Sequence, residues 1–123
     1  MLGLIKSLFG AGGASVSAAT AHELQRGGVP LVDVRENGEW AAGHAPGAFH
    51  VPLGEVQAGG LSALEARGVP LAGEGPVLFV CRSGMRSGVA CGALREALGE
   101  RAVNVEGGMM AWAAAGLPVE AGR

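Results

Sequence analysis

Short apolar runs alternate with helical segments along this chain of 123 residues, and that alternation restricts the fold more than any other feature. Runs such as "VPLVDV" (29–34) and "PVLFV" (76–80) are rich in β-branched residues and are short enough to be buried strands. Strands that alternate with helices favour a mostly parallel sheet with helices on both faces. We predict strands at 29–34, 47–53, 76–80 and 102–105, and helical segments at 17–28, 37–44, 61–68, 85–99 and 107–116.

The length and charge of the chain argue against several classes of protein. A chain of 123 residues is one domain by default and can bury a core without disulfides. Its formal net charge is -2, with neither a basic excess nor a basic stripe, so we expect no nucleic-acid partner. No apolar stretch approaches the roughly 18 residues of a membrane-spanning helix, so we expect no membrane span. The two cysteines form no disulfide framework, which favours a reducing compartment such as the cytoplasm.

The first residues differ in composition from the rest. Residues 1–14 contain a short apolar segment, "MLGLIKSLFG", followed by a glycine-rich stretch. We predict a frayed end or a short packing helix, then a flexible linker over 10–15, ahead of one domain over 15–120. The only charge in the apolar segment, Lys6, lies in its middle, which argues against a secretory signal. A weak contact with a membrane surface is the alternative.

The stretch "FVCRSGMRSG" (79–88) carries the strongest indication of chemistry. Cys81 ends a predicted buried strand and precedes a predicted helix, and in open α/β sheets ligands bind at the carboxyl ends of the strands. Free N–H groups at a helix N-terminus favour negative charge, and Arg86 adds a full positive charge. These features stabilise a thiolate over a thiol, so we predict that Cys81 is a nucleophile rather than a small core residue.

The residues after this cysteine form a predicted binding loop for an anionic substrate. Gly84 allows a tight backbone turn, and Ser83 and Ser87 offer hydroxyl donors. We predict that the guanidinium of Arg86 lies beside the mouth of the loop and binds an anionic donor. The alternative is that it points away and pairs with Glu96 or a loop carboxylate. The predicted substrate-binding residues are Arg82, Ser83, Gly84, Met85 and Arg86.

Three stretches together resemble the rhodanese-like sulfurtransferases. "CRSGMRS" (81–87) looks like the active-site loop of that family. "LVDVRENGEWAAGHAPGAFHVPL" (31–53) is similar to its first signature, and "VNVEGGMMAWAAAGLPV" (103–119) is similar to its C-terminal signature. The resemblance covers about residues 15–119 in one unbroken order. It implies a single α/β domain with the rhodanese-like three-layer fold, in which helices cover both faces of a five-stranded, mostly parallel sheet.

The resemblance also implies a reaction through a persulfide. The Cys81 thiolate attacks the outer sulfur of a donor such as thiosulfate, sulfite leaves, and the transferred sulfur stays on Cys81. A thiol, a protein acceptor or cyanide then removes that sulfur. The implied partners are a small anionic sulfur donor and a thiol or protein sulfur acceptor, and no metal or organic cofactor is implied. The sequence does not determine the oligomeric state.

Three alternatives stand beside this function. A cysteine-dependent phosphatase also uses a strand-end thiolate and a loop arginine, but its loop has one residue more than the C-x-x-x-x-R found here. The wider ring suits the three terminal oxygens of phosphate, whereas the shorter ring suits a single sulfur atom. A sulfur carrier with little turnover of thiosulfate fits the same residues. A non-catalytic interaction module is disfavoured, because the cysteine and both arginines are present.

Other polar residues near these segments receive structural roles. The resemblance implies that Asp33 and Arg35 tie a strand end to neighbouring loops, and Glu39 is a candidate partner of Arg35. We expect His44 to form a hydrogen bond with loop backbone, and a Cys81–His44 dyad is the alternative. No spacing of histidine and cysteine indicates a metal site, so we predict none.

Several further side chains are expected to pack rather than react. Cys91 lies at the margin of the core face that helical spacing predicts for 85–99. We interpret it as a small core residue, with a resolving thiol as the alternative. His22 is expected to face solvent. The predicted packing residues are Trp40, Trp112, Met109 and Met110, and the predicted core face of 85–99 consists of Ala90, Ala93, Leu94 and Ala97.

Overall fold

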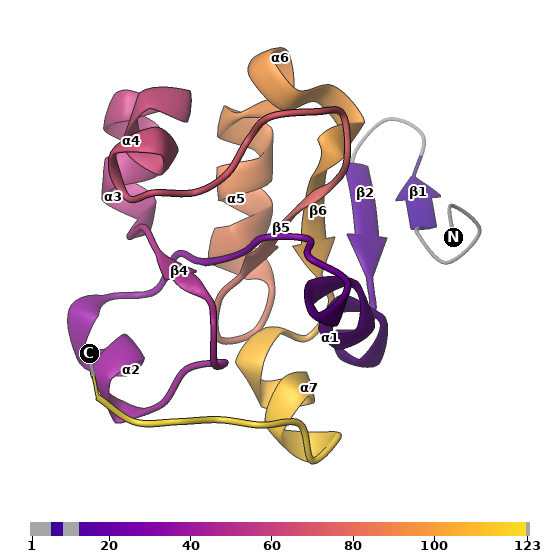
Figure 1. The fold of residues 1–123 in the computed structure, drawn as a ribbon, viewed down its shortest axis with the longest axis vertical. Coiled ribbons are helices and arrows are strands. Elements are labelled where there is room, and N and C mark those ends of the chain that lie inside the picture. Colours follow the sequence, from indigo (N-terminus) through magenta and orange to yellow (C-terminus); the bar gives the residue numbers. More distant parts are fainter. Residues whose placement is uncertain (1–5, 9–12, 123) are drawn as a thin grey trace.

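The structure of the chain, a computed structural model, describes residues 6–8 and 13–122. Six strands form one sheet in the order β1-β2-β6-β5-β3-β4 (Figure 1). Five of them are parallel, and β1 pairs with the edge of β2 in antiparallel orientation. The strands are β1 (Lys6–Leu8), β2 (Gly13–Val16), β3 (Leu31–Asp33), β4 (Phe49–His50), β5 (Val77–Val80) and β6 (Ala102–Val105).

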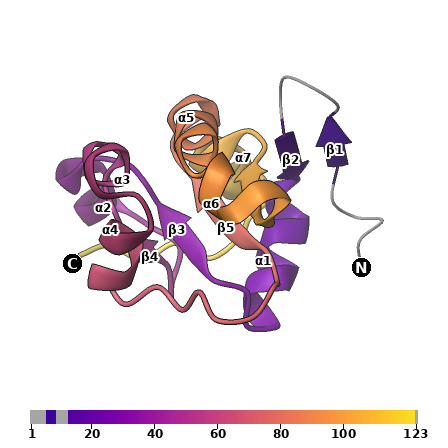
Figure 2. The same cartoon turned by 90° about the horizontal axis from the view of Figure 1, so that it is seen from above.

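Helices cover both faces of the sheet, so the molecule has three layers (Figure 2). Two helices, α1 and α7, pack on one face, and α3 to α6 pack on the other. The short helix α2 follows the carboxyl end of β3. The helices are α1 (Ala18–Arg26), α2 (Asn37–Ala42), α3 (Leu53–Gly59), α4 (Leu61–Ala66), α5 (Met85–Ala93), α6 (Arg95–Leu98), the 3-10 helix η2 (Gly99–Arg101) and α7 (Gly108–Ala114).

The sheet divides the core into two hydrophobic clusters. In the central strand β5, Val77 and Phe79 face the cluster under α3 to α6, while Leu78 and Val80 face the cluster under α1 and α7. Successive side chains of a strand point to opposite faces, so a strand that is covered on both sides is apolar throughout. This explains why "VLFV" is an unbroken apolar run. Trp112 of α7 is fully buried in the second cluster.

The predicted fold class is confirmed, with differences at the elements that carry weak local signals. The five parallel strands and the helices on both faces agree with the prediction, and β1 adds a sixth, antiparallel strand. The predicted linker at 10–15 is wrong for its last residues, because 13–16 form strand β2, in which 14–16 pair with β6. Helix α3 has no counterpart among the predicted elements. Its apolar positions are few, and Val56 is its only buried residue.

The predicted helix at 85–99 is interrupted at Leu94. This residue caps both α5 and α6, and the residues buried on either side of it belong to the same hydrophobic cluster. Ala90 and Leu94 are buried as predicted, but Ala93 and Ala97 are exposed. The buried residues Ala90, Cys91, Leu94 and Leu98 follow helical spacing, so the core face is a single stripe that is rotated from the predicted one toward Cys91 and Leu98.

The predictions for the apolar N-terminal segment lie partly outside the described residues, which omit 1–5 and 9–12. Within the segment, residues 6–8 form β1 rather than a helix. Among the described residues, no helix is long and apolar enough to cross a membrane.

Candidate active site

Cys81 directly follows β5, which lies between β6 and β3 in the sheet. The loop from Cys81 to Gly84 then leads into α5, so the thiol lies at the carboxyl end of a central parallel strand and before a helix N-terminus. Gly84 adopts a φ of +107°, a left-handed conformation that glycine adopts without strain. The backbone turns sharply there, which brings the Gly84 N–H to the Cys81 sulfur.

Hydrogen-bond donors surround the Cys81 sulfur. The Gly84 N–H donates to Sγ at 3.1 Å, and the Ser87 hydroxyl lies 3.3 Å from it. Burial raises the pKa of the Cys81 thiol, but the Ser87 hydroxyl and the backbone N–H groups of Ser87, Gly84 and Ser83 lower it more strongly. The pKa of Cys81 therefore lies below its ordinary value. A thiol in such an environment supplies a thiolate nucleophile.

The N-terminus of α7 holds the outer side of the loop. The N–H groups of Met109 and Met110 donate to the carbonyl oxygens of Cys81 and Arg82 at 2.8 and 3.0 Å. Gly108, with a φ of +57°, makes this approach feasible, because a Cβ there would overlap the Cys81 carbonyl oxygen and lie 2.6 Å from the Arg82 carbonyl carbon. With these carbonyls bound on the outside, the N–H groups of the next residues are free to face the sulfur.

Asn104 supports the loop from the neighbouring strand β6, and sequence reasoning did not single it out. Its Nδ2 donates to the Gly84 carbonyl at 3.0 Å, and its Oδ1 accepts from the Ser87 hydroxyl at 2.6 Å. The amide thus connects the two residues that donate to Cys81. One signal was available in the sequence: a lone polar side chain within the apolar strand "AVNV".

Arg86 pairs with Glu39, which lies 47 positions earlier in the chain. Its Nη1 and Nη2 donate to the two carboxylate oxygens at 2.7 and 2.9 Å. The structure therefore has the alternative arrangement, pairing with a carboxylate, instead of the predicted guanidinium that is available to a donor at the loop mouth, and the carboxylate is Glu39 of α2 in place of Glu96. The predicted pairing of Glu39 with Arg35 is wrong, because the Arg35 guanidinium binds Asp33 instead.

Asp33 and Arg35 form a buried pair at the end of β3. The Arg35 Nε and Nη2 donate to the Asp33 carboxylate at distances from 2.8 to 3.1 Å, and Nη2 also donates to the Gly43 carbonyl at 2.7 Å. These contacts tie the strand end to the turn after α2. The pair lies beneath the surface, and no hydrogen bond joins it to the Cys81 sulfur among the described residues.

His44 forms its hydrogen bond with backbone and not with the thiol. Its Nδ1 lies 2.8 Å from the Trp40 carbonyl oxygen, and its ring stacks on the Trp40 ring at a centroid distance of 3.6 Å. His50 stacks on the same tryptophan and bonds to the Arg35 carbonyl oxygen at 2.7 Å. The two histidines and Trp40 therefore stabilise α2, and the Cys81–His44 dyad is not formed.

Cys91 lies inside the core rather than at its margin. Its exposed fraction is 2%, and burial raises the pKa of its thiol to about 12, although the nearby Arg95 lowers it. A buried thiol of this kind stays protonated at neutral pH. The position therefore favours a small core residue over a resolving thiol.

Two other expectations are wrong because of how α7 packs. Met109 is buried, but Met110 has an exposed fraction of 54% beside the loop. His22 is half-buried, and its ring centroid lies 5.5 Å from that of Trp112 in an edge-to-face arrangement. Helix α7 packs against α1, so that Trp112 lies beside His22 and Met110 lies toward solvent. The spacing of residues along the chain does not reveal this placement.

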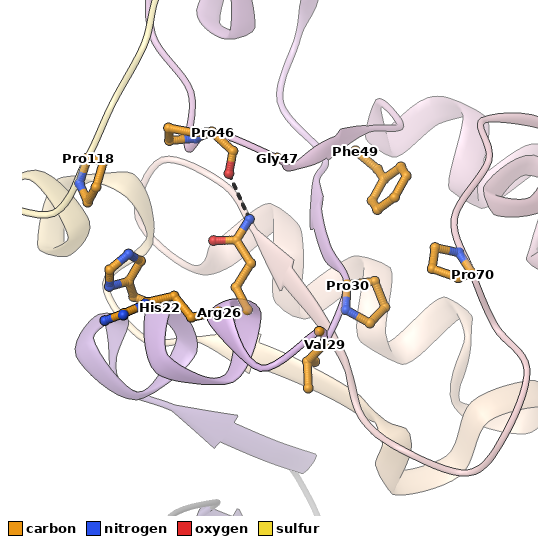
Figure 3. Close-up of a pocket in the computed structure, with 11 residues that line it drawn as sticks. His22, Arg26, Val29, Pro30, Pro46, Gly47, Phe49, Pro70 and Pro118 are labelled. Carbon is orange, nitrogen blue, oxygen red and sulfur yellow. Dashed lines mark hydrogen bonds between the residues drawn. The ribbon is translucent and has the colours of Figure 1, made fainter.

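A hollow of about 400 Å³ lies on the α1 side of the molecule (Figure 3). His22 and Pro118 lie at one end of it, and Phe49 and Pro70 lie at the other. Pro30, one of its lining residues, directly precedes β3, so the hollow lies near the amino end of that strand, whereas the thiol lies at the carboxyl end of the sheet. Its lining includes no residue of the predicted site.

The described residues contain no group of three or more His, Cys, Asp or Glu side chains that could hold a metal ion.

Residues 17–115 match the Rhodanese-like domain family. The chain belongs to the rhodanese-like family. In this chain Cys81 lies in the loop after β5, and Gly108 makes the close contact between α7 and that loop.

Similar proteins of the rhodanese-like family include named sulfurtransferases. The chain is 44% identical over 82 residues to "Putative sulfurtransferase YtwF" of Bacillus subtilis, covering 67% of this chain and 71% of the relative. It is 36% identical over 111 residues to thiosulfate sulfurtransferase 16, chloroplastic, of Arabidopsis thaliana, covering 87% and 92%. Sulfur transfer in general is the activity that these relatives support. The chain spans only about half of two other curated relatives, at 47% and 54% of their lengths.

The fold also matches solved rhodanese structures. A rhodanese-related protein from Thermoplasma volcanium is similar with a TM-score of 0.70 and 28% identity, covering 86% of this chain and 96% of that one. The rhodanese-like fold is thus supported by both sequence and structure.

Proposed function

We propose that the protein transfers a sulfane sulfur from an anionic donor of the thiosulfate type, through a persulfide on Cys81, to a thiol, a protein acceptor or cyanide. The observation that carries this proposal is the ring of donors around one thiol whose pKa is lowered. These donors stabilise the attacking thiolate, and the same N–H groups would stabilise the anionic outer sulfur of the persulfide.

The two proposed half-reactions balance without any cofactor. The Cys81 thiolate attacks the outer sulfur of thiosulfate, a new S–S bond forms, and the old S–S bond breaks with its electron pair leaving on sulfite. The acceptor then attacks the outer sulfur of the persulfide and leaves Cys81 as a thiolate. Cyanide becomes thiocyanate, and a thiol becomes a persulfide. Because each cycle needs Cys81 as a free thiolate, we propose a reducing setting such as the cytoplasm.

A second candidate function is a sulfur carrier with little turnover of thiosulfate. The pairing of Arg86 with Glu39 favours it, because that arginine is then less available to an anionic donor. The two functions share the Cys81 persulfide and differ in the donor that loads it.

Reaction with thiosulfate followed by intact-mass measurement tests the proposed function. We expect a gain of one sulfur atom on the wild-type protein and on Cys91→Ala, because Cys91 is buried and protonated. We expect no gain on Cys81→Ser and loss of its thiosulfate:cyanide activity, with an unchanged circular dichroism spectrum. Equal activity in Cys81→Ser would overturn the persulfide mechanism.

A further inference from the structure

Arg86 already has an anionic partner inside the protein. Both of its terminal nitrogens bind the Glu39 carboxylate, and the exposed fractions of the two side chains are 33% and 32%. This two-point contact occupies one of the two edges of the guanidinium that can bind two oxygens side by side. An anionic donor that approaches Arg86 therefore meets the negative charge of Glu39 beside the positive charge of the arginine.

The backbone of α2 holds Glu39 in place independently of Arg86. Glu39 lies in the first turn of α2, and its Oε1 also accepts the N–H of Glu36 at 3.0 Å. The end of α2 is fixed in turn by the bond from Arg35 to the Gly43 carbonyl. Hydrogen bonds from Arg86 lower the pKa of Glu39 to about 2 although burial opposes them, so the carboxylate is ionised at any working pH. Glu39 is thus a fixed anion in contact with the loop arginine.

We propose that Glu39 is a specificity-determining residue of the sulfur-transfer site: by neutralising Arg86, it disfavours dianionic donors such as thiosulfate relative to singly charged donors such as thiosulfonates and the persulfides of thiols. This inference rests on the proposed function, because it concerns the donor that loads Cys81.

Arg82, which directly follows Cys81 in the chain, is the other cation of the loop. Its side chain is exposed, and it forms no ion pair with any residue in the described part of the chain. Its carbonyl is fixed by Met110 of α7, so the residue is anchored at the loop while the guanidinium stays free. A donor with one negative charge is balanced by this single unpaired cation, whereas a donor with two negative charges keeps one of them without a partner.

A pair of small donors isolates the effect of charge. Thiosulfate is a dianion, and methanethiosulfonate carries a methyl group in place of one of its oxygens and is a monoanion. With either donor, the Cys81 thiolate attacks the outer sulfur and the bond from that sulfur to the sulfonyl sulfur breaks. The electron pair leaves on sulfite in one case and on methanesulfinate in the other, and Cys81 carries the same persulfide.

The experiment measures kcat/KM for each donor with cyanide as acceptor, in the wild-type protein and in Glu39→Gln. The variant frees the Arg86 guanidinium, whose attraction acts on two charges of thiosulfate and on one of methanethiosulfonate. We expect kcat/KM to rise roughly fivefold to tenfold for thiosulfate and by less than about twofold for methanethiosulfonate. Glu39→Ala frees Arg86 in the same way and serves as a second variant should Glu39→Gln not fold.

Two controls separate this effect from a general loss of charge. The double variant Glu39→Gln/Arg86→Gln removes both charges of the pair, so the ratio of its kcat/KM for thiosulfate to its kcat/KM for methanethiosulfonate should stay within about threefold of the wild-type ratio. Glu55→Gln breaks a similar two-point contact, with Arg67, between α3 and the end of α4, and should change the use of neither donor.

The outcomes distinguish this inference from the proposed function. If the wild-type protein gains sulfur on Cys81 but Glu39→Gln and Glu39→Ala leave donor preference unchanged, the role of Glu39 is overturned and the function stands. The role is also overturned if the gain persists in the double variant, because Arg86 then does not mediate it. If neither donor adds sulfur to Cys81 of the wild-type protein, the proposed function itself fails.

Discussion

Ser87 carries one hydroxyl proton and lies within hydrogen-bonding distance of two acceptors. These are the Cys81 sulfur at 3.3 Å and the Asn104 amide oxygen at 2.6 Å. A thiol can itself donate to Ser87, so the hydroxyl proton then goes to Asn104. A thiolate accepts only, and a bond to an ionised acceptor is worth roughly twice a neutral one. The hydroxyl is therefore expected to turn to the sulfur when Cys81 ionises.

This geometry predicts the effect of Ser87→Ala. Loss of the hydroxyl removes a donor to the thiolate, so the pKa of Cys81 should rise, and the thiosulfate kcat/KM at neutral pH should fall roughly tenfold. The rate of alkylation of Cys81 as a function of pH measures the pKa directly. Ser83→Ala is the matched control, because the Ser83 side chain is exposed and only its backbone N–H serves the sulfur. Equal alkylation profiles for wild type and Ser87→Ala would contradict this role.

At the scale of elements, the site depends on how α7 meets the loop after β5. The first N–H groups of α7 have no acceptor inside the helix, and they donate to the carbonyl oxygens of Cys81 and Arg82. These hydrogen bonds hold the loop against the end of the helix. The contact is close because the residue at the start of α7 is Gly108. The helix thus stabilises the loop conformation that turns the other N–H groups toward the sulfur.

Gly108→Ala should break this contact. The substitution costs the strain of a left-handed φ, about 1–2 kcal/mol, and the added Cβ also pushes the loop away from α7, so we expect a total loss of at least about 3 kcal/mol in the free energy of unfolding. Loading of Cys81 with sulfur should slow as the loop moves.

Gly116→Ala is the control for backbone strain alone. Gly116 has a φ of +73°, close to that of Gly108, but a Cβ at this position would meet no atom within 4 Å. Urea unfolding should therefore show the smaller cost of about 1–2 kcal/mol and unchanged loading. Similar losses in both variants would mean that the contact between α7 and the loop contributes little.

At the scale of the whole molecule, the pair of Arg86 and Glu39 joins α2 to α5 across the carboxyl edge of the sheet. The pKa of Glu39 is about 2 in the folded protein against an ordinary value of 4.5. Because folding lowers this pKa, the pair stabilises the protein fully above pH 4.5, and the contribution is lost as the pH falls toward 2.

The wild-type protein should therefore be more stable than Glu39→Gln at about pH 6, and the difference should shrink progressively below pH 4.5. Urea unfolding of both proteins between about pH 6 and about pH 2.5 measures it, and the glutamine variant itself supplies the reference that cannot titrate. A difference that stays constant over this range would show that the ion pair does not contribute to stability.

The sequence by itself determined the features that depend on neighbours along the chain. Runs of β-branched residues predicted β3, β5 and β6, and glycines predicted where several helices end. The position of Cys81 between a strand and a helix followed from the same local pattern, because the carboxyl end of a parallel strand and a helix N-terminus are defined by a few consecutive residues. The resemblance to the rhodanese-like family rested on motifs of the same kind.

Only the tertiary structure decided which distant side chains meet. Arg86 could have reached the loop mouth or a carboxylate, and the placement of α2 within reach of the start of α5 selected Glu39, 47 positions away. Asn104 and Ser87 meet because β6 lies next to β5 and under α5, and Cys91 is buried because α5 rotates that side chain into the core. Local patterns do not specify such contacts, since they depend on strand order and on the rotation of each helix.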